Sequence, residues 1–167
     1  MKKRITINGA ETLQETFKQT YKVQVNMHFE HLCAQNEDEK FLREIVEYIK
    51  QNISNPELSI VALSREMKIS RAWLYRKILK FTGKSPVEFI RAIRLQKAVQ
   101  LLENSQMRIG LIACEVGFNN PHYFSKLFKK EYDILPSVYI HFARKAQAQV
   151  ILNDYGLTNT IKTDFLG

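Results

Sequence analysis

One pattern of apolar residues and turn formers occurs twice in this chain, about 50 residues apart, and it restricts the fold more than any other feature. The second copy runs from Ile109 to Pro136, with apolar residues at helical spacing before Gly117 and again after Asn120. Gly117 supplies the permissive backbone of a sharp turn, and Asn120 followed by Pro121 suits the start of a helix. Each copy therefore predicts two short helices joined by a tight turn.

The two copies correspond position by position, with an offset of 49 residues before the turn and 50 residues after it. The corresponding pairs are Ile60 and Ile109, Leu63 and Ile112, Glu66 and Glu115, Met67 and Val116, Ile69 and Phe118, Trp73 and Tyr123, Leu74 and Phe124, Ile78 and Phe128, Gly83 and Asp133, Pro86 and Pro136, Phe89 and Tyr139, and Ile90 and Ile140. Between the copies, Ser85 and Pro86 open an apolar-striped helix that reaches Asn104 and would span about 27 Å.

These patterns predict an all-α fold of about seven helices: two helix-turn-helix subdomains joined by a long linker helix, with a partly ordered N-terminal arm. The arm is too short to form a core of its own. An amphipathic helix from Phe41 to Ile53 begins the domain. The predicted boundaries are 1–40 for the arm, 41–145 for the domain (41–84 for the first subdomain, 85–104 for the linker helix, 105–145 for the second subdomain) and 146–167 for a C-terminal tail.

The repeat also predicts which side chains face the core. Trp73 corresponds to Tyr123, so we expect it to point inward with Leu74. Cys114 follows the apolar stripe of the second copy and is expected to be a core residue, whereas Leu111 is expected to be partly exposed. Two cysteines this far apart match no metal or redox spacing.

The basic charge is concentrated in the repeated region. The chain carries 25 basic and 17 acidic side chains, a net charge of +8. Between Phe41 and Lys145, 18 basic and nine acidic residues give +9, whereas the rest of the chain has a net charge of −1. Such an excess favours a polyanionic partner, because binding releases condensed counterions. A soluble basic domain with a solvated face is the alternative on composition alone.

Specific motifs occur in both halves of the domain. The second half contains Ile109, Ile112-Ala113, Val116-Gly117-Phe118, Tyr123-Phe124-Ser125-Lys126, Phe128-Lys129-Lys130 and Pro136. The first half contains Leu58-Ser59-Ile60, Leu63, Ile69-Ser70-Arg71, Leu74-Tyr75-Arg76-Lys77, Thr82-Gly83-Lys84-Ser85-Pro86, Phe89-Ile90, Arg94-Leu95, Lys97-Ala98 and Leu101-Leu102. Together they closely resemble the DNA-binding domain of AraC/XylS-type regulators, over about Phe41 to Arg144. Asp133 stands where that family commonly has glycine, but aspartate tolerates left-handed backbone.

The resemblance implies a bacterial, cytoplasmic, sequence-specific transcription regulator, usually an activator, that binds double-stranded DNA without a cofactor and contacts RNA polymerase. Its two recognition helices would enter successive major grooves, about 34 Å apart along the duplex. The chain has no room for the ligand-binding barrel usual in this family. It is therefore expected to be a small stand-alone regulator or the C-terminal output fragment of a larger one, such as a hybrid two-component sensor. Residues 1–40 would then serve a homodimer or an upstream regulatory domain.

The predicted base-reading residues lie on the outer face near the start of each recognition helix, because that end enters the groove first. They are Arg71, Ala72, Tyr75 and Arg76 in the first helix, and Pro121, His122, Ser125 and Lys126 in the second. Arg76 is the leading candidate, since a guanidinium pairs bidentately with guanine, and a surface salt bridge is its alternative. The predicted phosphate contacts are Ser59, Lys77, Lys80, Lys84, Asn120, Lys129 and Lys130.

Two other classes of function are weaker fits. An enzyme is not expected, because the sequence has no nucleophile–base–acid set and no glycine-rich phosphate loop. His28, Glu30, His31 and Cys33 invite a metal site, but no further ligand follows at a regular spacing, so no metal is expected. A helical protein-interaction module without DNA would be separated from a DNA-binding domain by a salt-dependent binding measurement. No apolar run reaches the length of a membrane span.

Overall fold

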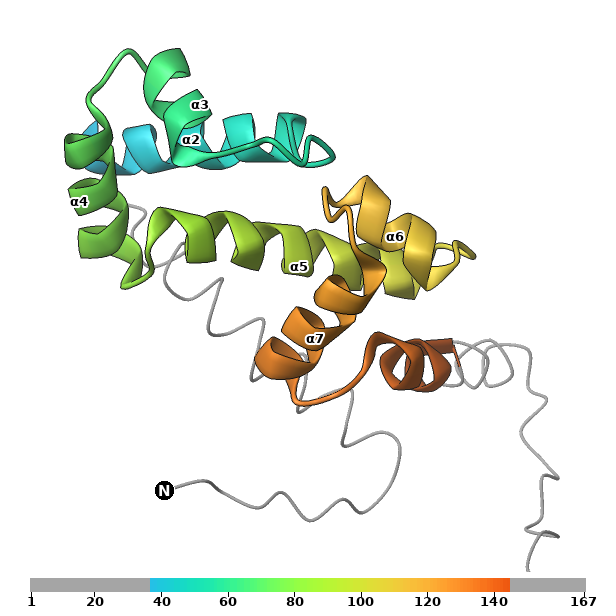
Figure 1. Cartoon of the computed structure of the whole chain (residues 1–167). Coiled ribbons are helices and arrows are strands. Elements are labelled where there is room, and N and C mark those ends of the chain that lie inside the picture. Colours follow the sequence, from blue (N-terminus) through green and yellow to red (C-terminus); the bar gives the residue numbers. More distant parts are fainter. Residues whose placement is uncertain (1–36, 145–167) are drawn as a thin grey trace, which may run out of the picture.

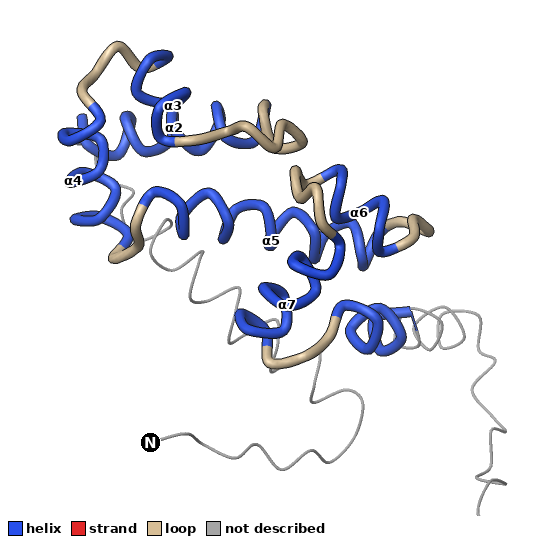
Figure 2. Tube along the Cα trace, viewed as in Figure 1, coloured by secondary structure: helices blue, strands red, loops and turns tan. Residues whose placement is uncertain are grey.

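A computed structural model describes residues 37–144, and over this range the regular secondary structure is all helical, with turns and loops between the helices (Figures 1 and 2). The helices are α2 (Glu37–Gln51), α3 (Ile60–Glu66), α4 (Arg71–Thr82), α5 (Pro86–Asn104), α6 (Ile109–Glu115) and α7 (Pro121–Tyr132), followed by a helix described over residues 136–144. The all-α prediction, with two helix-turn-helix units on a linker helix, is confirmed for the described residues. His28, Glu30, His31 and Cys33, which invite a metal site but are not expected to hold a metal, lie outside them.

The first subdomain packs α2, α3 and α4 around the N-terminal half of α5. Its core is made by the apolar residues Ile45, Ile49, Leu58, Leu63, Leu74, Ile78, Phe89, Ile90 and Ile93. Five of these side chains are completely buried, and burying each contributes about 1.5–3 kcal/mol relative to exposure. The helix predicted from Phe41 to Ile53 begins earlier and ends two residues sooner, at Gln51.

The second subdomain packs α6, α7 and the helix over residues 136–144 against the C-terminal half of α5. Its core contains Leu95, Ala98, Leu102, Ile112, Ala113, Val116, Phe118, Phe124, Phe128 and Tyr132. The aromatic rings of α7 pack in sequence, with centroids 5.8 Å apart for Phe124 and Phe128 and 4.5 Å apart for Phe128 and Tyr132. The last described helix is tied to α5 by the Tyr139 hydroxyl, which donates to Glu103 Oε1 at 2.5 Å.

Helix α5 belongs to both cores. Its first half contributes Phe89, Ile90 and Ile93 to the first subdomain, and its second half contributes Leu95, Ala98 and Leu102 to the second. A helix that is apolar on more than one face is covered on more than one face, which is why α5 lies at the centre of Figure 1. The two subdomains are therefore joined by a shared packed element and not by a flexible linker.

Side chains at the helix starts satisfy backbone N–H groups. Ser59 Oγ accepts from Ala62 N at 3.4 Å and Ser70 Oγ accepts from Trp73 N at 3.3 Å. At the start of α5, Ser85 N donates to Glu88 Oε2 at 2.9 Å, which completes a capping box. The hydrogen bonds from Ser85 hold the pKa of the Glu88 carboxyl below its usual value.

Left-handed backbone occurs at the ends of α4 and α7 and in both helix-turn-helix turns. Gly83 ends α4 with φ 65°, and Asp133 takes the corresponding place after α7 with φ 58°, as predicted. In the turns, Lys68 has φ 53° and Gly117 has φ 79°. The first turn therefore accepts a residue with a side chain where the second turn has glycine.

Three core predictions are wrong, those for Trp73, Tyr123 and Cys114, and Tyr123 is 41% exposed. Trp73 is 37% exposed and packs edge-to-face against Phe41, with ring centroids 5.0 Å apart. Leu74 and Ile78 fill the inner face of α4, so the neighbouring indole lies at its margin. Cys114 is exposed, because Ile112 and Ala113 occupy the inner face of α6. The prediction for Leu111 is confirmed, since it is 56% exposed.

Within the described residues, no helix has both the length and the hydropathy to cross a lipid bilayer. The same residues contain no group of three histidine, cysteine, aspartate or glutamate side chains placed to hold a metal ion.

Candidate nucleic-acid interface

Helix α4 presents the first predicted base-reading set on one exposed face. Arg71, Ala72, Tyr75 and Arg76 are all exposed, and they lie away from the buried Leu74. Arg71 and Tyr75 are four residues apart, and so are Ala72 and Arg76. These side chains therefore form a stripe near the start of the helix. Tyr75 is 44% exposed, so its phenol is available beside the two guanidinium groups.

Helix α7 presents the second set in the same way. Pro121, His122 and Lys126 are exposed, and Ser125 is half-buried. The Ser125 hydroxyl donates to Pro121 O at 2.9 Å, so its proton is used within the helix and its oxygen remains free to accept. The Ser125 side chain is therefore less available to a base edge than the exposed side chains of this set.

The charges on these two helices are almost all positive. Helix α4 carries four basic residues and no acidic residue. Helix α7 carries three lysines and a histidine, with Glu131 as its acidic residue. By contrast, α2 has five acidic residues in its 15 positions. The basic excess seen in the sequence is thus placed on the helices that carry the predicted recognition residues.

Several predicted phosphate contacts have aromatic or acidic neighbours. Lys77 Nζ lies 5.1 Å from the centre of the Trp73 ring, and Lys80 Nζ lies 5.2 Å from that of Phe81. Such stacking keeps the charged end near an exposed surface while the stem covers the ring. Lys84 Nζ lies 3.9 Å from Glu131 Oε1, and both side chains are half-exposed, so this pair contributes little to stability. Lys129 and Lys130 are exposed.

The cap residues Ser59 and Asn120 are less available for phosphate than predicted. Asn120 Oδ1 accepts from His122 N at 2.9 Å and from Tyr123 N at 3.1 Å, and Pro121 has no N–H to offer. The Asn120 amide nitrogen is the remaining donor of that side chain. At the start of α3, the Ala62 N–H already donates to Ser59 Oγ.

One charged residue inside the fold has no role predicted from the sequence. Arg94 is buried in the middle of α5, and its guanidinium donates to Gly117 O at 3.0 Å and to Asn55 O at 2.6 Å. The signal that could have revealed it is its register, because Arg94 lies four residues from both Ile90 and Ala98 and so falls on the apolar stripe of the helix. An arginine there must find partners, because burying an unpaired charge is costly.

Comparison with known proteins identifies the domain. A family model described as a helix-turn-helix domain matches residues 63–141. A histidine kinase P4 from Formosa agariphila is 40% identical over 102 residues, which make up 61% of this chain and 7% of that protein. A lactose operon transcription activator from Staphylococcus xylosus is 33% identical over 130 residues, or 78% of this chain and 43% of that protein. The chain thus spans less than half the length of either relative.

Among solved structures, the C-terminal domain of AraT, a response regulator from Geobacillus stearothermophilus, superposes with a TM-score of 0.59. The alignment covers 64% of this chain and 88% of that domain, at 29% identity. The AraT domain is thus matched over most of its length.

Proposed function

We propose that the chain is a member of the AraC/XylS family of helix-turn-helix regulators, and that it binds specific DNA sequences and activates transcription. The observation that carries the proposal is the pair of basic helices α4 and α7, each with an exposed polar stripe near its start. Residues 41–145 are proposed as the DNA-binding unit. It would act in the cytoplasm, where its DNA is.

In the proposed complex, α4 and α7 enter successive major grooves with their N-terminal ends first. Grooves on one face of B-form DNA recur about every 34 Å, and the helix α5 holds the two units apart. Arg71, Tyr75 and Arg76 would contact base edges from α4, and His122 and Lys126 would do so from α7. Ala72 suits contact with a thymine methyl group, whereas Pro121 and Ser125 would contact bases at the entry of α7.

Phosphate contacts would fix the register without reading sequence. Lys80, Lys129 and Lys130 are suited to this by exposure, and Lys77 by its position beside Trp73. Lys84 would have to turn from Glu131, a small cost for an exposed pair. Ser59 and Asn120 would contribute only at the edges of the interface, because their side chains cap helices.

Activation is proposed to proceed through contact with RNA polymerase. The relative named as a lactose operon transcription activator supports this direction of control. Residues 1–40 are proposed to mediate dimerisation or to join an upstream regulatory domain.

The test is selection of bound sites from a random DNA library, followed by fluorescence anisotropy on the selected duplex and a scrambled duplex. We expect preference for the selected duplex and a steep loss of affinity as salt rises, because phosphate contacts release counterions. Arg76→Ala combined with Lys126→Ala should abolish the preference. Lys50→Ala is the matched control, since Lys50 is an exposed lysine on α2 paired with Glu47 at 2.8 Å. Equal affinity for both duplexes would overturn the proposal.

A second candidate is that this domain is the output part of a larger sensor-regulator. The observation in its favour is the 40% identity to a histidine kinase of which the aligned region is 7%. An antibody against residues 41–145, used on extracts of the source cells, would distinguish the two. A band much larger than the 19.6 kDa of this chain supports the larger regulator, and a band at that mass supports the stand-alone protein.

A further inference from the structure

Arg94 occupies an unusual position for a charged side chain. It is 7% exposed and lies on α5 where the core of the first subdomain ends and that of the second begins. Within residues 40–144, no carboxylate lies within ion-pair distance of it. Burial lowers the pKa of the Arg94 guanidinium and the nearby Arg91 adds to this, yet an arginine stays charged at any ordinary pH. A buried cation with no counter-ion among the described residues calls for another explanation of its position.

The hydrogen bonds of Arg94 connect the two subdomains. Nη2 donates to the carbonyl of Asn55, in the segment between α2 and α3, at 2.6 Å. Nη1 donates to the carbonyl of Gly117, in the turn between α6 and α7, at 3.0 Å. The planar guanidinium also lies over the Phe118 ring, with Cζ 5.7 Å from its centre. One rigid group therefore holds the backbone of both subdomains.

Gly117 shows how closely the two units meet at this point. A Cβ atom on Gly117 would lie 2.4 Å from the Ile53 carbonyl oxygen and 2.8 Å from Arg94 Cζ. The turn before α7 thus rests directly on backbone of the first subdomain, with the Arg94 side chain beside it. The glycine is needed for this approach as well as for its φ of 79°.

Two further basic residues extend the contact from this turn along α7. Arg91, one turn before Arg94 on α5, has Cζ 5.7 Å from the centre of the Tyr123 ring at the start of α7. Lys84, before α5, pairs with Glu131 at the end of α7. The start of α7 therefore faces Arg91 and its end faces Lys84, and in Figure 1 α7 slopes back toward the side of the molecule on which α4 lies.

We propose that Arg94 is a positioning residue that fixes the orientation of α7 relative to α4 by holding the carbonyls of Asn55 and Gly117 together. The distance between the DNA half-sites that both helices can occupy at once would then be set by this contact. That consequence rests on the proposed DNA binding, whereas the fixed arrangement of the two subdomains does not. Shared packing on α5 alone would leave the turn before α7 free to shift against the first subdomain.

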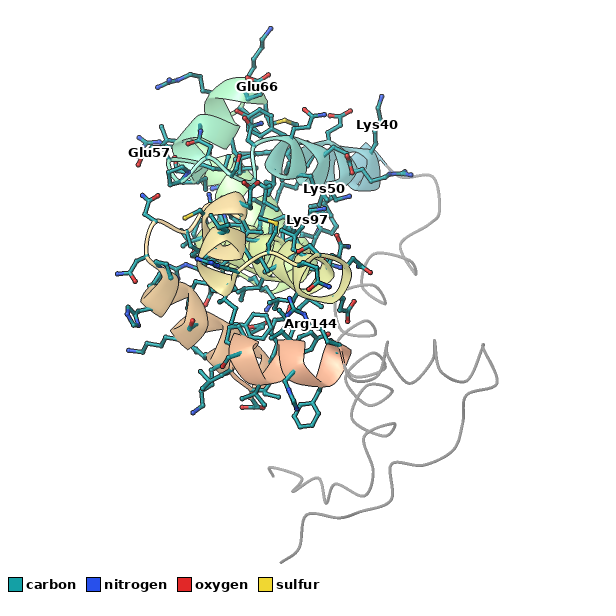
Figure 3. The ribbon with its side chains drawn as sticks, turned by 90° about the vertical axis from the view of Figure 1, so that its right-hand side faces the viewer. Lys40, Lys50, Glu57, Glu66, Lys97 and Arg144 are labelled. Carbon is teal, nitrogen blue, oxygen red and sulfur yellow. The ribbon has the colours of Figure 1, made fainter. Side chains whose placement is uncertain are left out.

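The first test measures the arrangement without DNA. Spin labels are placed on cysteines at Glu66 and Glu115, exposed positions that correspond in the two repeats, after replacement of Cys33 and Cys114 by serine. Electron–electron resonance then gives the distribution of distances between the labels. Figure 3 shows Glu66 at one end of the molecule, clear of the contact with the second subdomain. We expect a narrow distribution for the otherwise unchanged protein.

Arg94→Met keeps the side-chain volume but removes both hydrogen bonds, and it should broaden or shift the distribution. Arg94→Lys should give an intermediate result, because an ammonium cannot span both carbonyls as a planar fork does. Ile45→Val is the control, since it loosens the core of the first subdomain away from the contact. If Arg94→Met fails to fold by circular dichroism, Arg94→Lys decides the question. An unchanged distribution in the folded variant would overturn the proposal.

The second test uses the duplex selected by the wild-type protein, a shortened duplex with one half-site, and duplexes with two base pairs inserted between half-sites. Loosening the arrangement lowers the effective concentration of the second helix, so Arg94→Met should lose about tenfold in affinity on the two-site duplex. The affinity of Arg94→Met for one half-site should hardly change. The two-base-pair insertions should lower the affinity of this variant less than they lower the affinity of the wild type. Equal loss on one and two half-sites would show general destabilisation and refute positioning. If wild-type protein prefers no DNA, the proposed function fails and the label distances alone decide.

Discussion

Replacing Gly117 by alanine should be far more damaging than replacing Gly83, although both residues have left-handed backbone. Gly83 has φ 65°, and a Cβ there would meet nothing within 4 Å. Gly117 has φ 79°, and its Cβ would lie 2.4 Å from the Ile53 carbonyl oxygen. The Gly83 variant therefore reports backbone strain alone, whereas the Gly117 variant reports strain and a collision.

The sizes of the two effects follow from these environments. A non-glycine residue in left-handed backbone costs roughly 1–2 kcal/mol, which is the expected loss for Gly83→Ala. Overfilling a packed site costs roughly 1–3 kcal/mol more, so Gly117→Ala should lose about 2–5 kcal/mol. The neighbour cannot yield cheaply, because the nearest atom is backbone and the next group, Arg94, is held by two hydrogen bonds.

Urea denaturation followed by circular dichroism measures both losses on the same scale. Gly110→Ala is a third variant: Gly110 lies within α6, with nothing within 4 Å of its Cβ position, so alanine should stabilise the protein by about 0.5–1 kcal/mol. Equal destabilisation by Gly83→Ala and Gly117→Ala would refute the close approach between the subdomains.

Four further outcomes are expected. Arg76→Ala should cost roughly 1–3 kcal/mol of binding and relax preference at one base pair, so an equal loss on selected and scrambled duplexes would contradict its base-reading role. Lys80→Ala should weaken binding to every sequence and flatten the dependence on salt measured by anisotropy, and an unchanged salt slope would exclude a phosphate contact. Asn120→Ala should lower the free energy of unfolding by about 0.5–2 kcal/mol in urea titrations, because two backbone N–H groups lose their acceptor, whereas an unaltered midpoint would show that water replaces the cap. The hydrogen bonds from Ser85 lower the pKa of the Glu88 carboxyl in the folded state, so the stabilisation they give is present above the unfolded pKa and is lost as pH falls through the folded pKa. Glu88→Gln should therefore flatten the acid side of a plot of unfolding free energy against pH. Parallel plots for the variant and the wild type would contradict this.

Most of the local structure was predictable from the sequence, because it depends on residues close together in the chain. The caps at Ser70 and Ser85 each use a side-chain oxygen and a backbone N–H three residues later. The left-handed ends at Gly83 and Asp133 depend on the backbone preference of one residue. The repeat supports two of these features, since Ser70 corresponds to Asn120 and Gly83 corresponds to Asp133.

Side-chain burial was predictable only in part. The inner faces of α4 and α6 follow the helical period, yet Trp73 and Cys114 lie outside the core. Both residues adjoin inward positions, and the period alone does not say how wide the buried face is. That width depends on how closely the neighbouring helices pack, which is a property of the assembled fold.

The sequence by itself determined the two helix-turn-helix units, their spacing along the chain and the concentration of positive charge on α4 and α7, because periodicity, turn chemistry and charge are local properties. Only the tertiary structure decided how the second unit rests on the first. Arg94 meets the carbonyls of Asn55 and Gly117 through contacts between residues 39 and 23 positions away in the chain. A backbone carbonyl leaves no mark on the identity of its residue, so such a contact appears only once the chain has folded.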